Sequence, residues 1–311
     1  MRPRVLTNQI GYHPRAIKNA ILQSEHDHGP LPFAVVHEQT NEVVFEGLTA
    51  PAVAIDQWGA GRGRFAAMDF SALSQCGAFA IQVKPPEASA GGAVGTVAPP
   101  LRSLPFEIAD HQLIKNAVSD NIYYFRGQRL DGFLEAAMRR AVFAGAPGRT
   151  ADVRGGWRDA TGDWSKNLSH LRYSSYMNPQ QAPLPVWTML AATEALEGAR
   201  YGGAALLRRF LRDEAAWGAD GLVRMQDPEG YFYMMAFYDK REGSSTICDY
   251  GFFHYPEKRP TYRCDWRSGG GMAIAALARA AAAGVACDFA PQDYLNAARR
   301  GFDHLDAQYA R

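Results

Sequence analysis

The period of the apolar residues changes near residue 110, and this change divides the 311-residue chain into two parts. Before it, apolar residues alternate in short runs, as Phe79, Ile81 and Val83 do, which is the pattern of a half-buried strand. After it, they recur at every third or fourth position, which is the pattern of an amphipathic helix. A chain of this length also suits about two domains. We therefore predict two domains, 1–109 and 110–311.

Seven strand-like runs, separated by turn-forming residues, predict a β-sandwich of immunoglobulin-like type for the first domain. The runs cover 4–8, 18–23, 32–38, 42–47, 64–70, 77–84 and 103–108. The segment 85–100 is rich in proline, glycine and other small residues, so its composition suits an interdomain linker as well as a hairpin loop. We favour the loop, because the run that follows it still has the pattern of a strand of the same domain.

The second domain is predicted to be all-α with long loops. Helical patterns cover 110–127, 131–145, 185–199, 203–217, 268–284 and 291–310. The segments 149–184 and 226–264 are polar and aromatic without a sustained period, and we expect them to form loops around a site. The last helix runs to Arg311 without a stop signal, whereas stacked helix pairs need neighbours or caps on their outer faces. We expect the helical domain to be incomplete.

Composition narrows the classes of function. The formal net charge of +1 argues against nucleic acid and anionic membranes as partners. No apolar run reaches the length of a membrane span, and the N-terminus lacks the apolar core of a signal peptide. The predicted location is therefore the cytoplasm, with a secreted or periplasmic location as the alternative if a leader has been removed. The four cysteines have no paired spacing, and no metal-binding or nucleotide-binding motif is present. We predict free thiols, no bound metal and no cofactor.

The densest cluster of candidate site residues is the segment 152–166, "DVRGGWRDATGDWSK". Its glycines allow the backbone to turn sharply and to approach a ligand closely. Asp159 and Asp163 would repel each other on one helix face, so we expect a loop that aims both carboxylates at one point. Such a pair can hold and deprotonate a water molecule, while Trp157 and Trp164 offer flat faces on which sugars stack. The alternative is a solvated turn whose tryptophans enter the core.

Further polar and aromatic residues are candidates for binding an oligosaccharide. Tyr231, Phe232 and Tyr233 are possible platforms for sugar rings, although core packing is the usual role of a single aromatic residue. His170 can hydrogen-bond a sugar hydroxyl or serve as a structural histidine. Arg172 can contact the ligand or pair with an aspartate. The residues themselves leave these alternatives open.

Two segments carry a resemblance to a known family. "NQIGYHP" near the N-terminus, followed by the predicted sandwich, is similar to the immunoglobulin-like N-terminal domain of many glycoside hydrolase family 9 enzymes. "DVRGGWRDATGDWSK" resembles that family's D-V-x-G-G-W-x-D-A-G-D segment. The resemblance covers essentially the whole chain. It implies that an (α/α)6 barrel follows the sandwich, here cut to about half.

The resemblance implies an inverting glycoside hydrolase that cleaves β-glycosidic bonds. By position, Asp159 orients the attacking water and Asp163 is the general base. The family's general acid is a glutamate in the C-terminal part of the barrel, and no glutamate here lies in a corresponding motif. Glu194 has the setting of an ordinary helix residue, and Glu229 that of a turn residue. We therefore expect the chain by itself to be inactive or nearly so.

The sequence departs from the family's pattern by one residue, with D-A-T-G-D in place of D-A-G-D. Together with the segments 168–181 and 230–239, this insertion resembles the family's exo-acting glucosaminidase branch. That branch removes glucosamine or N-acetylglucosamine units from oligosaccharides. Two alternatives stay open: a β-1,4-glucanase (cellulase) of the same family, and a non-catalytic carbohydrate-binding remnant.

Overall fold

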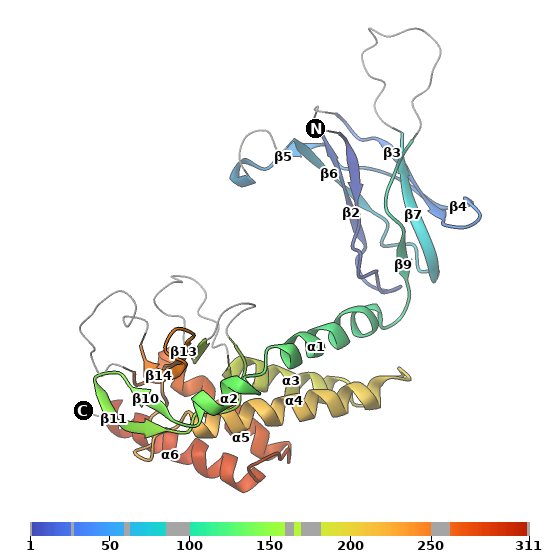
Figure 1. The fold of residues 1–311 in the computed structure, drawn as a ribbon. Coiled ribbons are helices and arrows are strands. Elements are labelled where there is room, and N and C mark those ends of the chain that lie inside the picture. The colour runs from blue at the N-terminus through green and yellow to red at the C-terminus, as the bar shows by residue number, and fades with distance from the viewer. Residues whose placement is uncertain are drawn as a thin grey trace, which may run out of the picture. The chain divides into compact units, whose positions relative to one another are not determined.

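The computed structural model describes residues 2–25, 28–58, 63–84, 100–158, 165–168, 182–249 and 262–309. The chain divides into two compact units, Met1–Ser119 and Asp120–Arg311. The division falls ten residues after residue 109, the predicted end of the first domain. The first unit consists mainly of strands, and the second combines helices with a small sheet (Figure 1).

The first unit is a sandwich of two antiparallel sheets, as predicted. One sheet has the strand order β1-β2-β6-β5, and the other has the order β4-β3-β7-β8, with β9 also paired to β7. The strands are β1 (Arg4–Leu6), β2 (Asn19–Ser24), β3 (Pro32–His37), β4 (Val43–Leu48), β5 (Val53–Ala54), β6 (Arg64–Asp69), β7 (Gly77–Val83), β8 (Leu101–Arg102) and β9 (Phe106–Ile108). Each of the seven predicted strands has a counterpart, and β5 and β8 are short additions.

The core of the sandwich lies between the two sheets. Phe79, Ile81 and Val83 of β7 are fully buried, as their alternation predicts. Val35 of β3 and Met68 of β6 belong to the same buried cluster, so both sheets contribute to it. Burying apolar surface of this kind is the main stabilising contribution to such a domain.

The chain re-enters the sandwich after residue 99. Strands β8 and β9 both pair with β7. Between them, the Ser103 hydroxyl accepts a hydrogen bond from the Ile81 amide at 2.9 Å. Residues 85–99 themselves lie outside the described residues, but the strands on either side of them share one sheet. The prediction that this segment connects parts of one domain is therefore confirmed.

The second unit contains long helices that lie side by side (Figure 1). Helix α3 packs against α4 and α5, and α5 packs against α6. Among the described residues the α-helices are α1 (Ser119–Gly127), α2 (Phe133–Met138), α3 (Pro183–Ala195), α4 (Ala204–Arg224), α5 (Gly271–Ala282) and α6 (Pro291–Tyr309). Two π-helical turns, Ile114–Val118 and Trp266–Gly270, precede α1 and α5, and a 3-10 turn in the first unit covers Asp56–Trp58. Each predicted helix has a counterpart. No complete (α/α)6 barrel is present in the described part of the chain.

A five-stranded sheet in the second unit contradicts the all-α prediction. Its strands are β10 (Ala141–Phe143), β11 (Ala146–Ala151), β12 (Ser165–Asn167), β13 (Met235–Asp239) and β14 (Ser244–Cys248), in the order β11-β10-β14-β13-β12. The predicted helix 131–145 is wrong after Met138, because the chain enters β10 and then turns at Gly145, whose φ is +78°. Strands β10 and β12 have three residues each, which is too few to show a period of two, and β11 contains Pro147 and Gly148, which are typical of turns.

The π-helical turn Trp266–Gly270, which leads into α5, illustrates how local sequence fixes a helix boundary. The Asp265 carboxylate accepts hydrogen bonds from the amides of Arg267 and Ser268 at 2.9 and 2.7 Å. The Ser268 hydroxyl in turn accepts one from the Asp265 amide at 2.8 Å. This reciprocal pair is a capping box, which satisfies amides that the first turn leaves unpaired.

Among the described helices, none has the length and apolar character needed to cross a membrane.

Candidate active site

Two glycines in the segment 152–166 form a tight turn against helix α4. Gly155 and Gly156 have φ values of +83° and +72°, which side chains other than glycine rarely adopt. Their backbone lies directly on Gly221, where a Cβ would stand 2.6 Å from the Gly156 amide nitrogen. The Trp217 indole donates a hydrogen bond to the Gly156 carbonyl at 2.9 Å. This glycine turn is therefore fixed by helix α4 on one side.

Trp157 follows the glycine turn and is anchored in the core. Its ring is 4% exposed, and its Nε1 donates to the Glu214 carboxylate at 2.7 Å. Glu214 is fully buried within α4 and also accepts two hydrogen bonds from Arg129, at 3.0 and 2.7 Å. Bidentate arginine–carboxylate pairs of this kind are strong and directional. In this arrangement the Trp157 ring leaves little surface on which a sugar can stack.

Lys166 links the parts of the chain that precede and follow Asp159 and Asp163 in the sequence. It lies in β12 and is 2% exposed. Its Nζ donates hydrogen bonds to the carbonyl oxygens of Val153 and Gly155, the latter at 2.8 Å. Burial, together with the nearby Arg224 guanidinium, lowers the pKa of Lys166 to about 7. The chain that follows the two aspartates is therefore hydrogen-bonded to the chain that precedes them.

Five of the predicted site residues lie outside the described residues. They are Asp159, Asp163, Trp164, His170 and Arg172. The described chain stops at Arg158 and resumes at Ser165, so the structure shows the two flanks of the aspartate pair. The roles of these five residues stay predictions.

The three neighbouring aromatics 231–233 are buried in the second unit. Tyr231 and Phe232 are fully buried, and Tyr233 is 2% exposed. The Tyr233 hydroxyl donates to Asp227 at 2.9 Å, and the Tyr231 hydroxyl accepts from Arg149 at 3.2 Å. The structure therefore places Tyr231 and Tyr233 in a polar network rather than on an open surface.

That network is centred on Arg149 and Asp227, two residues that the sequence analysis did not single out. Arg149 pairs with the Asp227 carboxylate, which is 2% exposed, and its guanidinium lies 4.1 Å from the centre of the Phe143 ring. Burial opposes the charge of Arg149, but the hydrogen bond to Tyr231 and the charge of Asp227 hold its pKa above the ordinary value. The two residues are 78 positions apart, so no sequence spacing indicates the pair.

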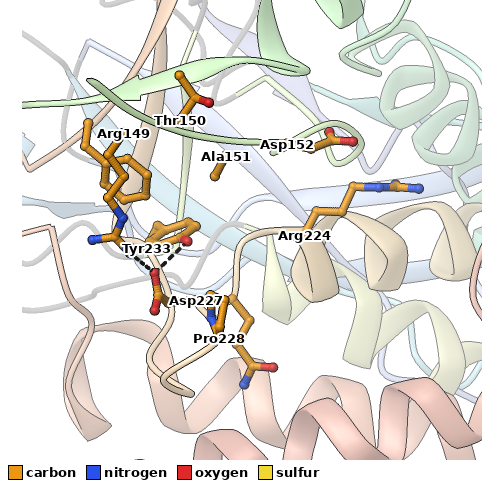
Figure 2. Close-up of a pocket in the computed structure, with 10 residues that line it drawn as sticks. Arg149, Thr150, Ala151, Asp152, Arg224, Asp227, Pro228 and Tyr233 are labelled. Carbon is orange, nitrogen blue, oxygen red and sulfur yellow. Dashed lines mark hydrogen bonds and ion pairs between the residues drawn. The ribbon is translucent and has the colours of Figure 1, made fainter. Parts of the chain in front are cut away.

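A pocket of about 350 Å³ with both polar and apolar lining residues opens beside the glycine turn (Figure 2). Figure 2 shows Arg149, Asp227 and Tyr233 grouped on one side, while Arg224 extends toward Asp152 on the other. The lining residues come from β10 and β11 with the adjoining Asp152, from the end of α4, and from the turn after it: Phe143, Arg149, Thr150, Ala151, Asp152, Arg224, Gln226, Asp227, Pro228 and Tyr233.

One group of side chains in the described part of the chain has the spacing of metal ligands. Asp220, Cys287 and Asp288 each offer a ligand atom within 4.8 Å of the others. The Asp220 carboxylate, however, accepts hydrogen bonds from the Tyr294 hydroxyl at 2.7 Å and from the Asp288 amide at 2.8 Å. Asp288 also pairs with Arg224. These partners account for the cluster as a structural one.

Comparison with known proteins bears on both units. The family model described as the cellulase N-terminal ig-like domain matches residues 1–87, which identifies the sandwich as immunoglobulin-like. Among curated protein sequences, none matches the chain significantly.

Solved structures resemble the chain over nearly all of its length. A single mutant of a thermostable endoglucanase from Alicyclobacillus acidocaldarius is 21% identical with a TM-score of 0.62, over 98% of this chain and 52% of its own. A Bacteroides ovatus protein described as GH9 is 17% identical with a TM-score of 0.63, over 99% of this chain and 54% of its own. A metagenome-derived glycoside hydrolase family 9 endoglucanase is 21% identical with a TM-score of 0.61, over 98% and 54%. The chain thus shares their fold and spans about half of their length.

Proposed function

We propose that this chain is the N-terminal part of an inverting glycoside hydrolase of family 9 that cleaves β-1,4-glucan chains. The observation that carries the proposal is the combination of fold and motif. The chain has the fold of endoglucanases over 98% of its length, with a matching N-terminal domain. Within that fold, the segment "DVRGG" ends in a glycine turn that is hydrogen-bonded to Trp217 and Lys166, three residues before Asp159 in the sequence.

Asp163 is proposed as the general base and Asp159 as the residue that orients the attacking water. In an inverting reaction the base removes a proton from water on one face of the sugar ring, while an acid protonates the leaving oxygen on the other. The two groups stand about 6.5–9.5 Å apart so that the water fits between them. The anchors at Trp157 and Lys166 support this proposal, because catalytic groups need a backbone that holds them in place.

Three glutamates of the second unit that the structure describes are engaged in ways that do not suit a general acid. Glu214 is fully buried and paired with Arg129, and Glu194 is an exposed helix residue paired with Arg279. Glu229 lies in a turn, where its carboxylate is exposed and lies 3.8 Å from Arg263. We therefore propose that a residue outside these 311 supplies the acid, and that the chain alone hydrolyses glucans at least 10²-fold more slowly than the longer protein.

The alternative substrates differ in one substituent. The exo-glucosaminidase reading rests on the resemblance of D-A-T-G-D and its neighbours, whereas the solved structures with the same fold are described as endoglucanases. We therefore favour a neutral glucan. A direct comparison of cellohexaose, chitohexaose and chitosan hexamer as substrates separates the two.

The test is hydrolysis by the longest form of the protein that the gene encodes. We expect cellohexaose to be cleaved, with the new reducing end released as the α-anomer in NMR spectra taken early in the reaction. Asp163→Asn should abolish cleavage, whereas Asp213→Asn, on helix α4, should leave it unchanged. Sugar binding that survives Asp163→Asn, with no turnover of any of the three oligomers by the unmodified protein, would instead identify a carbohydrate-binding remnant.

A further inference from the structure

We propose that the pocket beside the glycine turn is a subsite that binds one uncharged sugar ring of the glucan chain. This inference rests on the proposed function, and it adds a binding location and its residues. The pocket volume of about 350 Å³ is near the lower end of the range for ligand sites. It therefore suits a single ring rather than several.

The charges that line the pocket cancel, which argues for an uncharged ligand. Arg149 and Arg224 face Asp152 and Asp227, and each of the four has an ionic partner in the protein. A carboxylate or an ammonium group on the ligand would gain no unpaired counter-charge here and would lose its hydration. A ligand with hydroxyl groups can use both kinds of lining residue, because a hydroxyl both donates and accepts hydrogen bonds.

Hydrogen-bonding capacity remains on both sides of the pocket. The Arg149 guanidinium has five N–H donors, and it makes three hydrogen bonds within the described residues, to Asp227, Tyr231 and Tyr262. On the other side, the Asp152 carboxylate is held by Arg154, yet its side chain is 39% exposed and retains lone pairs. Donors and acceptors are therefore available at the two ends of one cavity.

Both groups are fixed before a ligand arrives. The Arg149 guanidinium lies 4.1 Å from the centre of the Phe143 ring and is bonded to the buried Asp227, which in turn is bonded to Tyr233. Asp152 accepts hydrogen bonds from Arg154 at 2.9 and 3.0 Å. Because these side chains are already ordered, binding does not require their conformational freedom to be lost again.

The pocket is continuous with the candidate active site. Asp152 precedes the glycine turn by three residues, and an Arg224 nitrogen lies 3.4 Å from the position that a Cβ on Gly155 would occupy. A sugar ring in the pocket would therefore contact the backbone that leads to Asp159. In a hydrolase that acts on a chain, such a neighbouring subsite holds the substrate in register with the reacting bond.

The experiment titrates the Asp163→Asn protein with cellotetraose, which removes turnover from the measurement. Thr150 lies at the pocket on an exposed strand, so Thr150→Trp should fill the cavity while leaving the fold intact. We expect Thr150→Trp to weaken binding at least tenfold by calorimetry. The matched control, Thr40→Trp in an exposed turn of the first unit, should not change it. In ¹H–¹⁵N spectra, cellotetraose should shift the amide signals of residues 149–152.

Three results would overturn the inference. If Thr150→Trp binds as tightly as its parent, or if the shifted amides lie elsewhere, the sugar binds at another place and the proposed function still stands. If chitosan tetramer binds this pocket more tightly than cellotetraose, the assignment to an uncharged ring is wrong. If no oligosaccharide binds and the longest form that the gene encodes cleaves none, the proposed function fails together with the subsite.

Discussion

The Nζ of Lys166 donates a hydrogen bond to the carbonyl oxygen of Gly155 at 2.8 Å. Eleven positions separate the two residues, and both proposed catalytic aspartates lie between them in the sequence. One buried amine thus bonds the chain on both sides of the aspartate pair. It also places an ionisable group where burial disfavours its charge.

Lys166→Met should change both the stability and its pH dependence. The pKa of Lys166 is about 7 in the fold and 10.5 as the ordinary value, so between these values the unfolded chain binds more protons and stability rises with pH. This contribution has a slope of up to about 1.4 kcal/mol per pH unit. Without the amine, this contribution to the pH dependence disappears. Near pH 9 the carbonyl oxygens of Val153 and Gly155 also lose their donor, which lowers the free energy of unfolding by about 1–3 kcal/mol. Urea unfolding from pH 6 to pH 9.5 measures both effects.

Lys240 provides the matched control, because it is an exposed lysine of the same unit. Lys240→Met should unfold with the pH dependence of the unmodified protein. Parallel stability curves for the unmodified protein and Lys166→Met would mean that Lys166 stays charged throughout and that the assigned shift is wrong.

Gly221→Ala should destabilise the second unit, although alanine favours a helix over glycine by about 1 kcal/mol. The new Cβ would stand 2.6 Å from the Gly156 nitrogen, and backbone cannot move aside as a side chain can. We expect a net loss of about 1–3 kcal/mol in the free energy of unfolding. Gly202→Ala is the control, since a Cβ there meets no atom within 4 Å and the change should stay within about 0.5 kcal/mol. Equal stability of the two variants would show that the glycine turn is not packed on α4.

The contrast between Gly221 and Gly155 shows what sequence reasoning can reach. The pair Gly155–Gly156 is visible as a turn because adjacent glycines beside polar residues are a local signal. Gly221 lies 65 positions after Gly156 and beyond residue 217, where the predicted helix ends, although α4 continues to Arg224. The role of Gly221 depends on which segment packs on it, and only the tertiary structure shows this.

The sandwich was predictable because five of its strands, β2, β3, β4, β6 and β7, have six or seven residues, long enough to alternate, and turn residues separate them. The five-stranded sheet of the second unit was not predictable in this way. Strand β10 has three residues, pairs in parallel with β14 about one hundred positions later, and follows directly on the short helix α2. The partner of Arg149 was hidden for the same reason, because long-range pairs leave no period in the sequence.

The four cysteines should react with a thiol reagent in a defined order. Cys76 is exposed and should react first at pH 8. Cys287 is also exposed, but partial burial and the neighbouring Asp220 raise the pKa of its thiol, so less thiolate is present and it should react more slowly. Cys248 and Cys264 are buried, which raises the pKa of each, and they should react only in denaturant. In a time-resolved thiol count, the native Cys76→Ser variant should therefore lack the fast phase and keep the slower one. Rapid labelling of three or more thiols in the native protein would contradict the described burial.

Glu214 should hold the glycine turn through Trp157. Glu214→Leu leaves the Trp157 indole and Arg129 without their acceptor, and we expect a loss of about 3–5 kcal/mol in stability. Glu214→Gln keeps an oxygen that can accept from Trp157 but gives up the ion pair, so its loss should be smaller. The exposed pair of Glu197 and Arg208 offers the control, since Glu197→Gln should cost under about 1 kcal/mol.

The indole N–H signal of Trp157 in NMR spectra reports this contact separately from global stability. It should keep its position in Glu197→Gln, shift modestly in Glu214→Gln, and move toward the free-indole position in Glu214→Leu. If the signal is unchanged in Glu214→Leu, Trp157 is held by ring packing alone, and the buried carboxylate serves Arg129 instead. If it moves as expected, the turn that leads to Asp159 is positioned by a hydrogen bond from the centre of α4, and substitutions at Glu214 should lower kcat of the longer protein more than they raise KM.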